Sequence, residues 1–429
     1  MRIVKLTKET TENILENMLK RSPTQYGTYE ASVQEIIENV KTRKDAAVFE
    51  YTEKFDHVVL SASTVEVTQK EIDEAYNIVD PELIGVIRRS MKNIRAFHEK
   101  QKQNSWFTST ENGTMLGQKL TALNRVGVYV PGGKAAYPSS VLMNILPAKV
   151  AGVREICMTT PCGKDGKVNP VVLAAAKEAG ADRVFKVGGA QAIAAMAYGT
   201  ESIGKVDLIA GPGNRYVTEA KRQVMGTVGI DSLAGPSEVL IVADETANPE
   251  YIAIDLLAQS EHDAFAQSTL IITDESKVPA ILKAMEELAA KLPTGEAAMQ
   301  SFADNGTIII ADDMDEMAAL ANEAAPEHLE VHTKDPVEYS QKLYQFGSLF
   351  IGEDAPVALG DYCSGTNHTL PTMKNARFSN GVYVGTFLKT SFVQHITKEG
   401  LVNLSDTCMT MAHTEGLAAH EMSVRIRLQ

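Results

Sequence analysis

The sequence predicts an α/β protein with parallel-rich sheets, a helical N-terminal segment and a helical C-terminal tail. Amphipathic helical patterns fill about the first 120 residues. From residue 126 onward, short apolar runs rich in β-branched residues alternate with Ala-rich helical stretches, which is typical of βα units on a parallel sheet. From residue 391 the pattern is helical again.

The N-terminal helices follow from apolar residues that recur with helical spacing. They are expected at residues 10–20, 32–55, 69–77 and 81–103. This part carries few side chains suited to chemistry, so we expect it to support the sheets.

Two series of βα units follow, and they indicate two Rossmann-like domains. In the first series, strands at 126–130, 155–159, 183–187 and 206–210 alternate with helices at 139–151, 170–179, 190–198 and 216–225. In the second, strands at 238–242, 268–272, 307–311 and 348–351 alternate with helices at 248–262, 276–291 and 313–324. The predicted organisation is an N-terminal helical segment (1–25), a discontinuous α/β domain with the metal and substrate site (26–125 and 237–380), a nucleotide-binding α/β domain (126–236) and a C-terminal dimerisation tail (381–429).

The composition and net charge of the chain limit the classes of protein to which it can belong. The chain is 44% hydrophobic and 22% charged, as is usual for a globular enzyme, and its net charge of -14 argues against nucleic acid or an anionic membrane as a partner. Four cysteines without CxxC spacing fit a reducing compartment. The first 20 residues lack an apolar h-region, so we expect neither a signal peptide nor a membrane span, and a cytoplasmic location.

Three glycine-containing loops follow strands of the first series. They are Tyr129–Gly133, Gly188–Gln191 and Gly211–Asn214. Glycine lets the backbone approach a ligand closely, and the N-terminus of the following helix favours an anion such as a pyrophosphate. None of the loops contains GxGxxG, and the acidic residue expected for a ribose is absent. Ordinary turn chemistry and a nucleotide site both remain open.

Gln259 and His262 offer possible metal ligands, because on a helix at 248–262 they would project from one face. The alternative is a partly exposed amide and imidazole at a helix end. Further ligand types follow at Asp361, His368, Glu415 and His420. Such a mixed oxygen and nitrogen set suits zinc, although manganese or cobalt would also fit.

Glu327 and His328 are adjacent and combine a carboxylate with an imidazole. At a loop entrance both could reach one substrate and act as an acid-base pair. Cys363 could be a nucleophile, but a small buried thiol is the simpler interpretation. Ser237 lacks the GxSxG context of a hydrolase nucleophile.

Ordered sequence blocks along nearly the whole chain resemble the histidinol dehydrogenase family. These enzymes oxidise L-histidinol through L-histidinal to L-histidine with two NAD molecules. The blocks are Val126–Gly133, Gly211–Val217, Asp231–Glu238, Ala258–His262, Ala325–Glu330, Gly365–Pro371 and Glu415–His420.

The resemblance implies a role for each matched position. One zinc per subunit would be held by Gln259, His262, Asp361 and His420, with His420 contributed by the other subunit of a homodimer. Glu327 and His328 would be the catalytic acid-base pair. NAD-binding positions would be Tyr129, Gln191 and Asn214. Substrate-binding positions would be Ser237, Gln259, His262, His328, Asp361, His368, Glu415 and His420.

Two other functions remain open at this point. One is a zinc hydrolase that uses Glu327 as a base, and the other is a non-catalytic nucleotide-binding scaffold. Failure to reduce NAD would favour the first. A protein that contains no metal, and whose function survives loss of Gln259 or His262, would favour the second.

Overall fold

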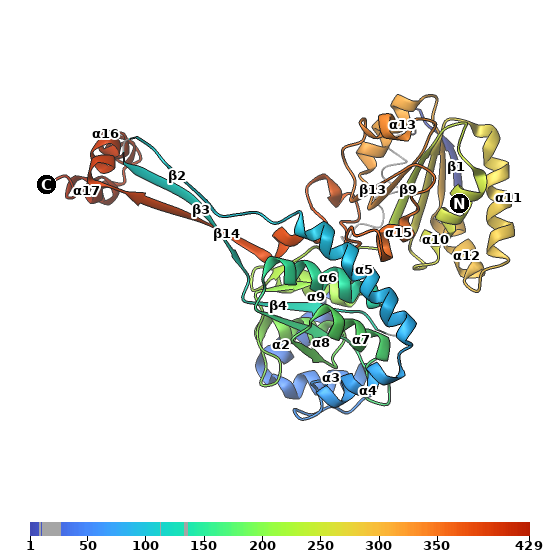
Figure 1. Ribbon diagram of the computed structural model, residues 1–429, viewed down its shortest axis with the longest axis horizontal. Coiled ribbons are helices and arrows are strands. Elements are labelled where there is room, and N and C mark those ends of the chain that lie inside the picture. The colour runs from blue at the N-terminus through green and yellow to red at the C-terminus, as the bar shows by residue number, and fades with distance from the viewer. Residues whose placement is uncertain (8–9, 11–26, 112, 133–135) are drawn as a thin grey trace.

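Two parallel sheets and one long arm make up the computed structural model (Figure 1). The structure describes residues 1–7, 10, 27–111, 113–132 and 136–429. The predicted helix at 10–20 lies outside these residues, apart from Thr10. The predicted α/β class with parallel sheets is confirmed.

The first sheet has six parallel strands in the order β1-β11-β10-β9-β12-β13. Side chains alternate along its strands, so that Val239 and Ile241 face one apolar cluster while Leu240 and Val242 face another. Helices α10, α11 and α12 build the first cluster, and α13 and α14 contribute to the second. The strands are β1 (Arg2–Lys5), β9 (Glu238–Ala243), β10 (Gln267–Ile272), β11 (Thr307–Ile310), β12 (His328–His332) and β13 (Ser348–Ile351). The helices are α10 (Pro249–Ser260), η2 (Glu275–Lys277), α11 (Val278–Ala289), α12 (Gly295–Asn305), α13 (Met314–Ala324), α14 (Pro336–Ser340) and α15 (Val357–Tyr362).

The second sheet has five parallel strands in the order β6-β5-β4-β7-β8. On one side of β4 lie β5 and β6, and on its other side lie β7 and β8. The strand order therefore reverses between β4 and β7. Open α/β sheets bind ligands at such a reversal. The strands are β4 (Arg125–Tyr129), β5 (Glu155–Thr159), β6 (Arg183–Phe185), β7 (Leu208–Ala210) and β8 (Gly229–Ile230). The helices are α6 (Pro138–Ala151), α7 (Pro170–Ala179), α8 (Gly189–Tyr198) and α9 (Arg215–Val224).

The N-terminal helices cover the five-stranded sheet, as Figure 1 shows. They are α2 (Gly27–Arg43), α3 (Asp45–Asp56), α4 (Gln69–Ile78) and α5 (Pro81–Glu99). The apolar faces of α2 and α3 share a buried cluster with α8 and α9, and those of α4 and α5 share one with α6 and α7. This packing joins residues 27–99 to the five-stranded sheet, and the domain boundaries expected from sequence stay a prediction.

Two segments expected to be helical contain strands. Arg2–Lys5 forms β1 at the edge of the six-stranded sheet, paired with Thr307–Ile310. Leu388–Ile396 forms β14, so the helical tail begins at α16 (Lys398–Thr414) and not at Ser391. Both corrections have the same cause, because each segment gains its hydrogen bonds from a partner strand that is distant in sequence.

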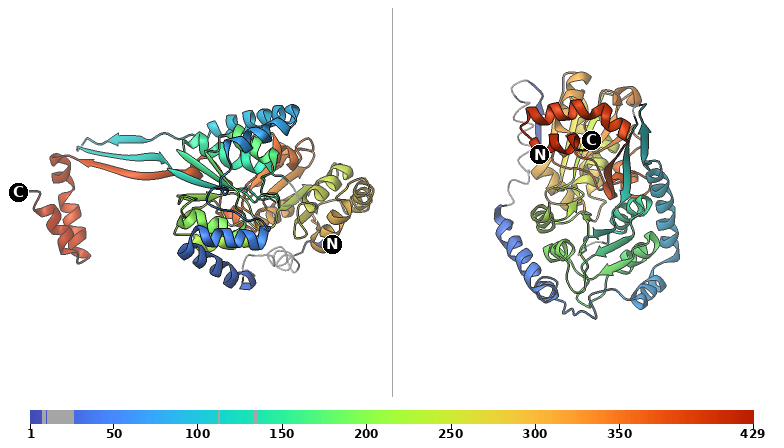
Figure 2. Two further views of the ribbon diagram at one scale, coloured as in Figure 1. Left: turned by 90° about the horizontal axis from the view of Figure 1, so that it is seen from below. Right: turned by 90° about the vertical axis from the view of Figure 1, so that its left-hand side faces the viewer.

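The arm is a three-stranded antiparallel sheet in the order β14-β3-β2, with β2 (Trp106–Ser109) and β3 (Thr114–Ala122). Helices α16 and α17 (Ala418–Arg425) lie at its tip, away from both parallel sheets (Figures 1 and 2). The short helices η3 (Asn375–Arg377) and η4 (Val384–Phe387) lie in the chain that leads to β14. Among the described residues, no helix has the length and apolar character needed to cross a membrane.

Candidate active site at the edge of β12

Glu327 and His328 lie where the chain enters β12, and one backbone segment holds both side chains. The Glu238 N–H donates to Glu327 Oε2 at 2.9 Å, and His328 Nδ1 lies 3.0 Å from the Glu238 carbonyl oxygen. Since a carbonyl can only accept, Nδ1 carries the ring proton and Nε2 is the free acceptor. His328 Nε2 is buried and has no hydrogen-bond partner. The site therefore presents an imidazole nitrogen ready to accept a proton.

The environment pushes the pKa values of these two groups in opposite directions. Burial raises the pKa of the Glu327 carboxyl well above its usual range, and the carboxylates of Glu238 and Asp361 add to this effect. Burial lowers the pKa of His328 to about 3, assisted by the positive charges that His262 and His368 could carry. A carboxyl that can hold a proton beside a neutral imidazole is a suitable arrangement for general acid-base catalysis.

Three side chains from different segments lie near His328. They are Asp361, His262 and His368. Asp361 Oδ1, near the end of α15, lies 3.9 Å from His328 Nε2. Burial raises the pKa of Asp361 to about 7 and lowers the pKa of His368 to about 4. Ser237 joins the same group, because its side chain lies near enough to Glu327 to oppose the rise in the pKa of that carboxyl.

Gln259 and His262 lie close together, but they do not share one helix face. Helix α10 ends at Ser260, so Gln259 lies in its last turn and His262 follows the helix. The His262 N–H donates to the Gln259 carbonyl oxygen at 3.3 Å. Gln259 is buried, whereas His262 is exposed in the single chain. The turn, and not the helical spacing, brings the two residues together.

Gln259, His262 and Asp361 fit a metal ion by their chemistry, because they supply oxygen and nitrogen donors of the types that zinc binds. Three buried nitrogens nearby have no hydrogen-bond partner: Gln259 Nε2, His328 Nε2 and His368 Nε2. An amide nitrogen can only donate, so Gln259 would bind an ion through Oε1, and its Nε2 suits an acceptor on a polar substrate.

His420 and Glu415 are not part of this cluster within one chain. Glu415 ends α16 and His420 lies in α17, at the tip of the arm, where both are exposed (Figure 1). The structure thus brings together Ser237, Gln259, His262, Glu327, His328, Asp361 and His368, and separates the two tail residues from them.

The three glycine loops meet at the carboxyl edge of the five-stranded sheet. The Gly189 N–H donates to the Tyr129 hydroxyl at 3.2 Å, which joins the first two loops. Gly211 has φ of 116°, and an added Cβ would lie 2.1 Å from the Tyr129 carbonyl oxygen, so only glycine allows this approach. Burial raises the pKa of Tyr129 to about 12, which keeps its hydroxyl protonated.

The two other predicted NAD-binding residues lie at helix N-termini along this edge. Gln191 is in the first turn of α8, and its Oε1 is buried without a partner. Asn214 caps α9, because its Oδ1 accepts from the N–H groups of Tyr216 and Val217 at 3.0 and 3.2 Å. Such edges favour bound phosphates.

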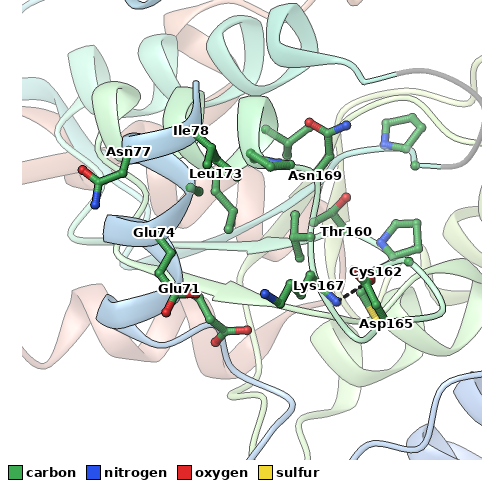
Figure 3. Close-up of a pocket in the computed structure, with 18 residues that line it drawn as sticks. Glu71, Glu74, Asn77, Ile78, Thr160, Cys162, Asp165, Lys167, Asn169 and Leu173 are labelled. Carbon is green, nitrogen blue, oxygen red and sulfur yellow. Dashed lines mark hydrogen bonds between the residues drawn. The ribbon is translucent and has the colours of Figure 1, made fainter. Parts of the chain in front are cut away.

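A cavity of about 770 Å³ opens along the same edge, beside the loops that follow β4 and β5. Figure 3 shows Glu71 and Glu74 from α4 on one side, facing Thr160, Cys162 and Asn169 from the loop after β5. The volume is within the range of small-molecule sites. Sequence reasoning did not include α4 in any site, because its acidic residues have the pattern of an ordinary solvated helix.

A buried ion pair supports the third loop and was also missed. Lys221 Nζ pairs with Asp231 Oδ1 and donates to the Gly211 carbonyl oxygen at 3.0 Å, while Asp231 Oδ2 accepts from the Gly211 N–H at 2.7 Å. The pair therefore holds both polar backbone groups of Gly211. No local motif marks these residues, since they are ten positions apart and meet only in the fold.

Comparison with known proteins gives one consistent family. The family model described as histidinol dehydrogenase matches residues 19–428. Histidinol dehydrogenase of Heliobacterium mobile is 47% identical over 414 residues, covering 96% of this chain and 97% of that protein. The enzyme of the same name from Methanocaldococcus jannaschii is 47% identical over 428 residues, covering 100% and 99%.

Solved structures agree with this result. The crystal structure of histidinol dehydrogenase from Elizabethkingia anophelis has a TM-score of 0.94 and 38% identity, and the match covers 100% of this chain and 98% of that one. An acetylating aldehyde dehydrogenase from Geobacillus thermoglucosidasius has a TM-score of 0.50 at 14% identity, covering 91% and 97%, and therefore shares the fold. The family expected from sequence is confirmed: this chain belongs to the histidinol dehydrogenase family.

Proposed function

We propose that this chain oxidises L-histidinol through L-histidinal to L-histidine at the site around His328. As a member of its family it is an NAD-dependent oxidoreductase of histidine biosynthesis that converts histidinol to histidine, and the family uses Zn²⁺ and NAD. This membership favours an oxidoreductase over the zinc hydrolase and the non-catalytic scaffold. The observation that carries the residue roles is the shared attachment of Glu327 and His328 to the backbone of Glu238.

The proposed metal ligands are Gln259, His262 and Asp361, together with His420 from a second copy of the chain. A zinc ion bound there would hold the imidazole and amino nitrogens of the substrate and so fix the position of the carbinol carbon. The unpartnered buried Nε2 atoms of Gln259 and His368 support a polar substrate bound beside this ion. Ser237, His368 and Glu415 are the proposed additional substrate contacts.

His328 acts first in the proposed mechanism. Its neutral Nε2 accepts the proton of the substrate alcohol while a hydride leaves the carbinol carbon and the aldehyde forms. NAD supplies the hydride acceptor in both oxidations. The fixed tautomer supports this role, because the Nδ1 proton is engaged by the Glu238 carbonyl and cannot compete.

Glu327 acts in the second oxidation. Its carboxylate removes a proton from water as the water oxygen bonds to the aldehyde carbon, which gives a hydrate. The hydrate then loses a hydride and a proton and becomes the carboxylic acid of L-histidine. Keeping the aldehyde bound between the two steps prevents it from reacting elsewhere.

The proposed NAD-binding residues are Tyr129, Gln191 and Asn214. They lie where the three glycine loops meet, next to the reversal of strand order between β4 and β7. The cavity beside the first of these loops is lined by Pro131 and Gly132 but by none of the three proposed residues (Figure 3). Because no dinucleotide fingerprint is present, we expect NAD to bind loosely.

A homodimer in which the arms are exchanged is the proposed assembly. The arm exposes large apolar side chains, including Phe392 at 84% and Met422 at 54% exposure. Exposed apolar surface of this kind marks an interaction site. A second copy covering the arm would bring His420 and Glu415 to a site that lacks them in one chain.

The four free cysteines support a cytoplasmic location for the assembly.

The first experiment measures NADH absorbance when the purified protein is mixed with L-histidinol and excess NAD. Chelator-treated and zinc-restored samples serve as controls. We expect two NADH per histidinol, lost on chelation and recovered with zinc. Formation of one NADH with release of the aldehyde, or of none with metal present, contradicts the proposal.

A second experiment tests the exchanged arms by mixing His262→Ala and His420→Ala proteins. Each variant alone is expected to be inactive. After the subunits exchange, a mixed dimer contains one site with an intact His262 and a His420 from the other subunit, so roughly a quarter of wild-type activity returns. If both residues of a site come from one chain, mixing restores nothing.

A further inference from the structure

Three polar side chains outside the proposed active site meet in the interior of the six-stranded unit. Residues at every second position of a strand share a face, so Glu330 and His332 follow His328 along one face of β12. Helix α10 packs against this side of the sheet and contributes Asp255, one turn before Gln259. Asp255, Glu330 and His332 thus form a separate cluster that neither the family's known positions nor the proposed mechanism uses.

The cluster has the geometry of a ligand set. His332 Nε2 lies 3.4 Å from Glu330 Oε2 and 3.9 Å from Asp255 Oδ2, and one ligand atom from each residue lies within 4.8 Å of the others. Ligand atoms around a tetrahedral zinc ion, with bonds of about 2.1 Å, are about 3.4 Å apart. A small contraction of the Asp255 contact would therefore suffice for binding.

Glu330 is held in a way that leaves one oxygen directed into the cluster. Its Oε1 accepts from the Val357 N–H at 3.1 Å, while its Oε2 has no hydrogen-bond partner although the residue is fully buried. A hydrogen bond to the second oxygen of a carboxylate is a common way to orient a metal ligand. This buried oxygen has an ion-pair contact with His332 at 3.4 Å but no hydrogen bond, so it remains available to a cation.

The charges of the cluster are not balanced by the surrounding protein. Among the described residues, His332 is the only cationic group within 4.0 Å of the Asp255 and Glu330 carboxylates. Burial raises the pKa of Asp255 to about 7, and the nearby Glu330 carboxylate adds to the rise. His332 can balance only one of the two carboxylates, so both stay charged in this dry interior only beside a further cation.

We propose that Asp255, Glu330 and His332 bind a second divalent cation, distinct from the zinc of the active site. Carboxylate oxygens with an imidazole nitrogen suit zinc or manganese. The ion links α10 to β12, the two elements that position Gln259 and His328. It acts as a structural tie for the active site and has no contact with the substrate.

The test counts metal per chain in the full-length protein. Wild type, His262→Ala and Glu330→Gln are stripped with a chelator, refilled separately with zinc or manganese, desalted and measured by plasma mass spectrometry. Glu250→Gln, which removes an exposed carboxylate from the same helix α10, is the matched control. We expect Glu330→Gln to lose one equivalent relative to wild type and to the control, and His262→Ala to retain one equivalent.

Each result decides separately between the two sites. Equal metal content in Glu330→Gln and wild type overturns the proposal, and so does a His262→Ala protein that binds none. If Glu330→Gln does not fold, the metal content of folded His262→Ala tests the proposal instead. Adding Asp255→Asn to His262→Ala must then remove the retained metal. In the overturned case a protonated His332 balances the Glu330 carboxylate while Asp255 holds a proton. If the proposed active-site zinc does not exist, the metal content of His262→Ala equals that of wild type.

Discussion

Glu327 Oε2 lies 3.6 Å from His328 Nδ1, and the N–H and the carbonyl of Glu238 hold the two side chains in place. The two groups are therefore fixed relative to each other but present different atoms to a substrate. His328 offers Nε2, and Glu327 offers a carboxyl that can hold a proton. This arrangement allows two proton transfers of different kinds within one site.

The division of labour between these residues predicts the behaviour of Glu327→Gln. The amide keeps the size of the side chain but cannot remove a proton from water, so the second oxidation should slow by about 10²- to 10⁴-fold while the first is nearly unchanged. Rapid-mixing measurements of NADH, starting separately from histidinol and from histidinal, distinguish the steps. Equal slowing from both starting compounds would contradict the assignment.

The buried Lys221–Asp231 pair predicts a loss of stability and of NAD affinity. Lys221→Met leaves the Asp231 carboxylate buried without its cation, which should cost about 3–5 kcal/mol of unfolding free energy. The loop at Gly211 also loses a backbone contact, so KM for NAD should rise more than KM for histidinol. Urea unfolding and steady-state kinetics measure the two effects. A double variant, Lys221→Met with Asp231→Leu, should be more stable than Lys221→Met alone; lower stability would contradict this account.

The burial of His98 leads us to predict that the unfolding free energy falls in acid. It is fully buried, its Nδ1 donates to the Ile94 carbonyl at 2.7 Å, and burial lowers its pKa below the ordinary 6.5. Below pH 6.5 the unfolded chain therefore binds more protons at this position than the folded chain, so the unfolding free energy falls as the pH falls.

Urea unfolding between pH 7.5 and about pH 5 tests this contribution through the slope of stability against pH. His98→Leu should be less stable at pH 7 but should show a shallower decline, whereas the exposed control His395→Gln should follow the wild type. A His98→Leu slope equal to that of wild type would show that His98 does not titrate on unfolding.

We predict that an alkylating reagent distinguishes buried from exposed cysteine thiols. Burial raises the pKa of the Cys157 thiol to about 12, so it stays protonated and unreactive, while Cys363 and Cys408 are exposed in the single chain. Iodoacetamide at pH 8 should label the exposed thiols and leave Cys157 unmodified, as peptide mass spectrometry would show. Cys363→Ser should retain activity within about a factor of three, because the proposed mechanism does not use this thiol. A much larger loss of kcat would give Cys363 a role in the reaction.

The sequence predicted the elements whose formation depends on local pattern. Strand β9 contains an apolar run after its first residue and β10 ends in one, and helices α7 and α13 have capping residues, so their positions agree with expectation within a few residues. The strands β2, β3 and β14 were missed because only their pairing with one another defines them, and the side chains of β2 and β14 are mostly exposed.

The candidate site was predicted only in part for a similar reason. Residue types and the family resemblance identified Glu327 and His328, but no pattern shows that the Glu238 backbone holds both of them. The alternation of His328, Glu330 and His332 in a buried strand was a visible signal for the second cluster. Asp255 completes that cluster from a helix more than 70 residues earlier, which only the fold reveals.

Strand β1 has a consequence for the synthesis of the protein. Residues 2–5 leave the ribosome long before their partner strand, which contains residues 307–310. At about 5–20 residues per second, the N-terminal strand waits for roughly 15–60 s before its place in the sheet exists. Meanwhile α2 to α5 can already pack on the five-stranded sheet. The smaller sheet can therefore mature during translation, whereas the sheet that carries the proposed catalytic pair closes only after most of the chain has been made.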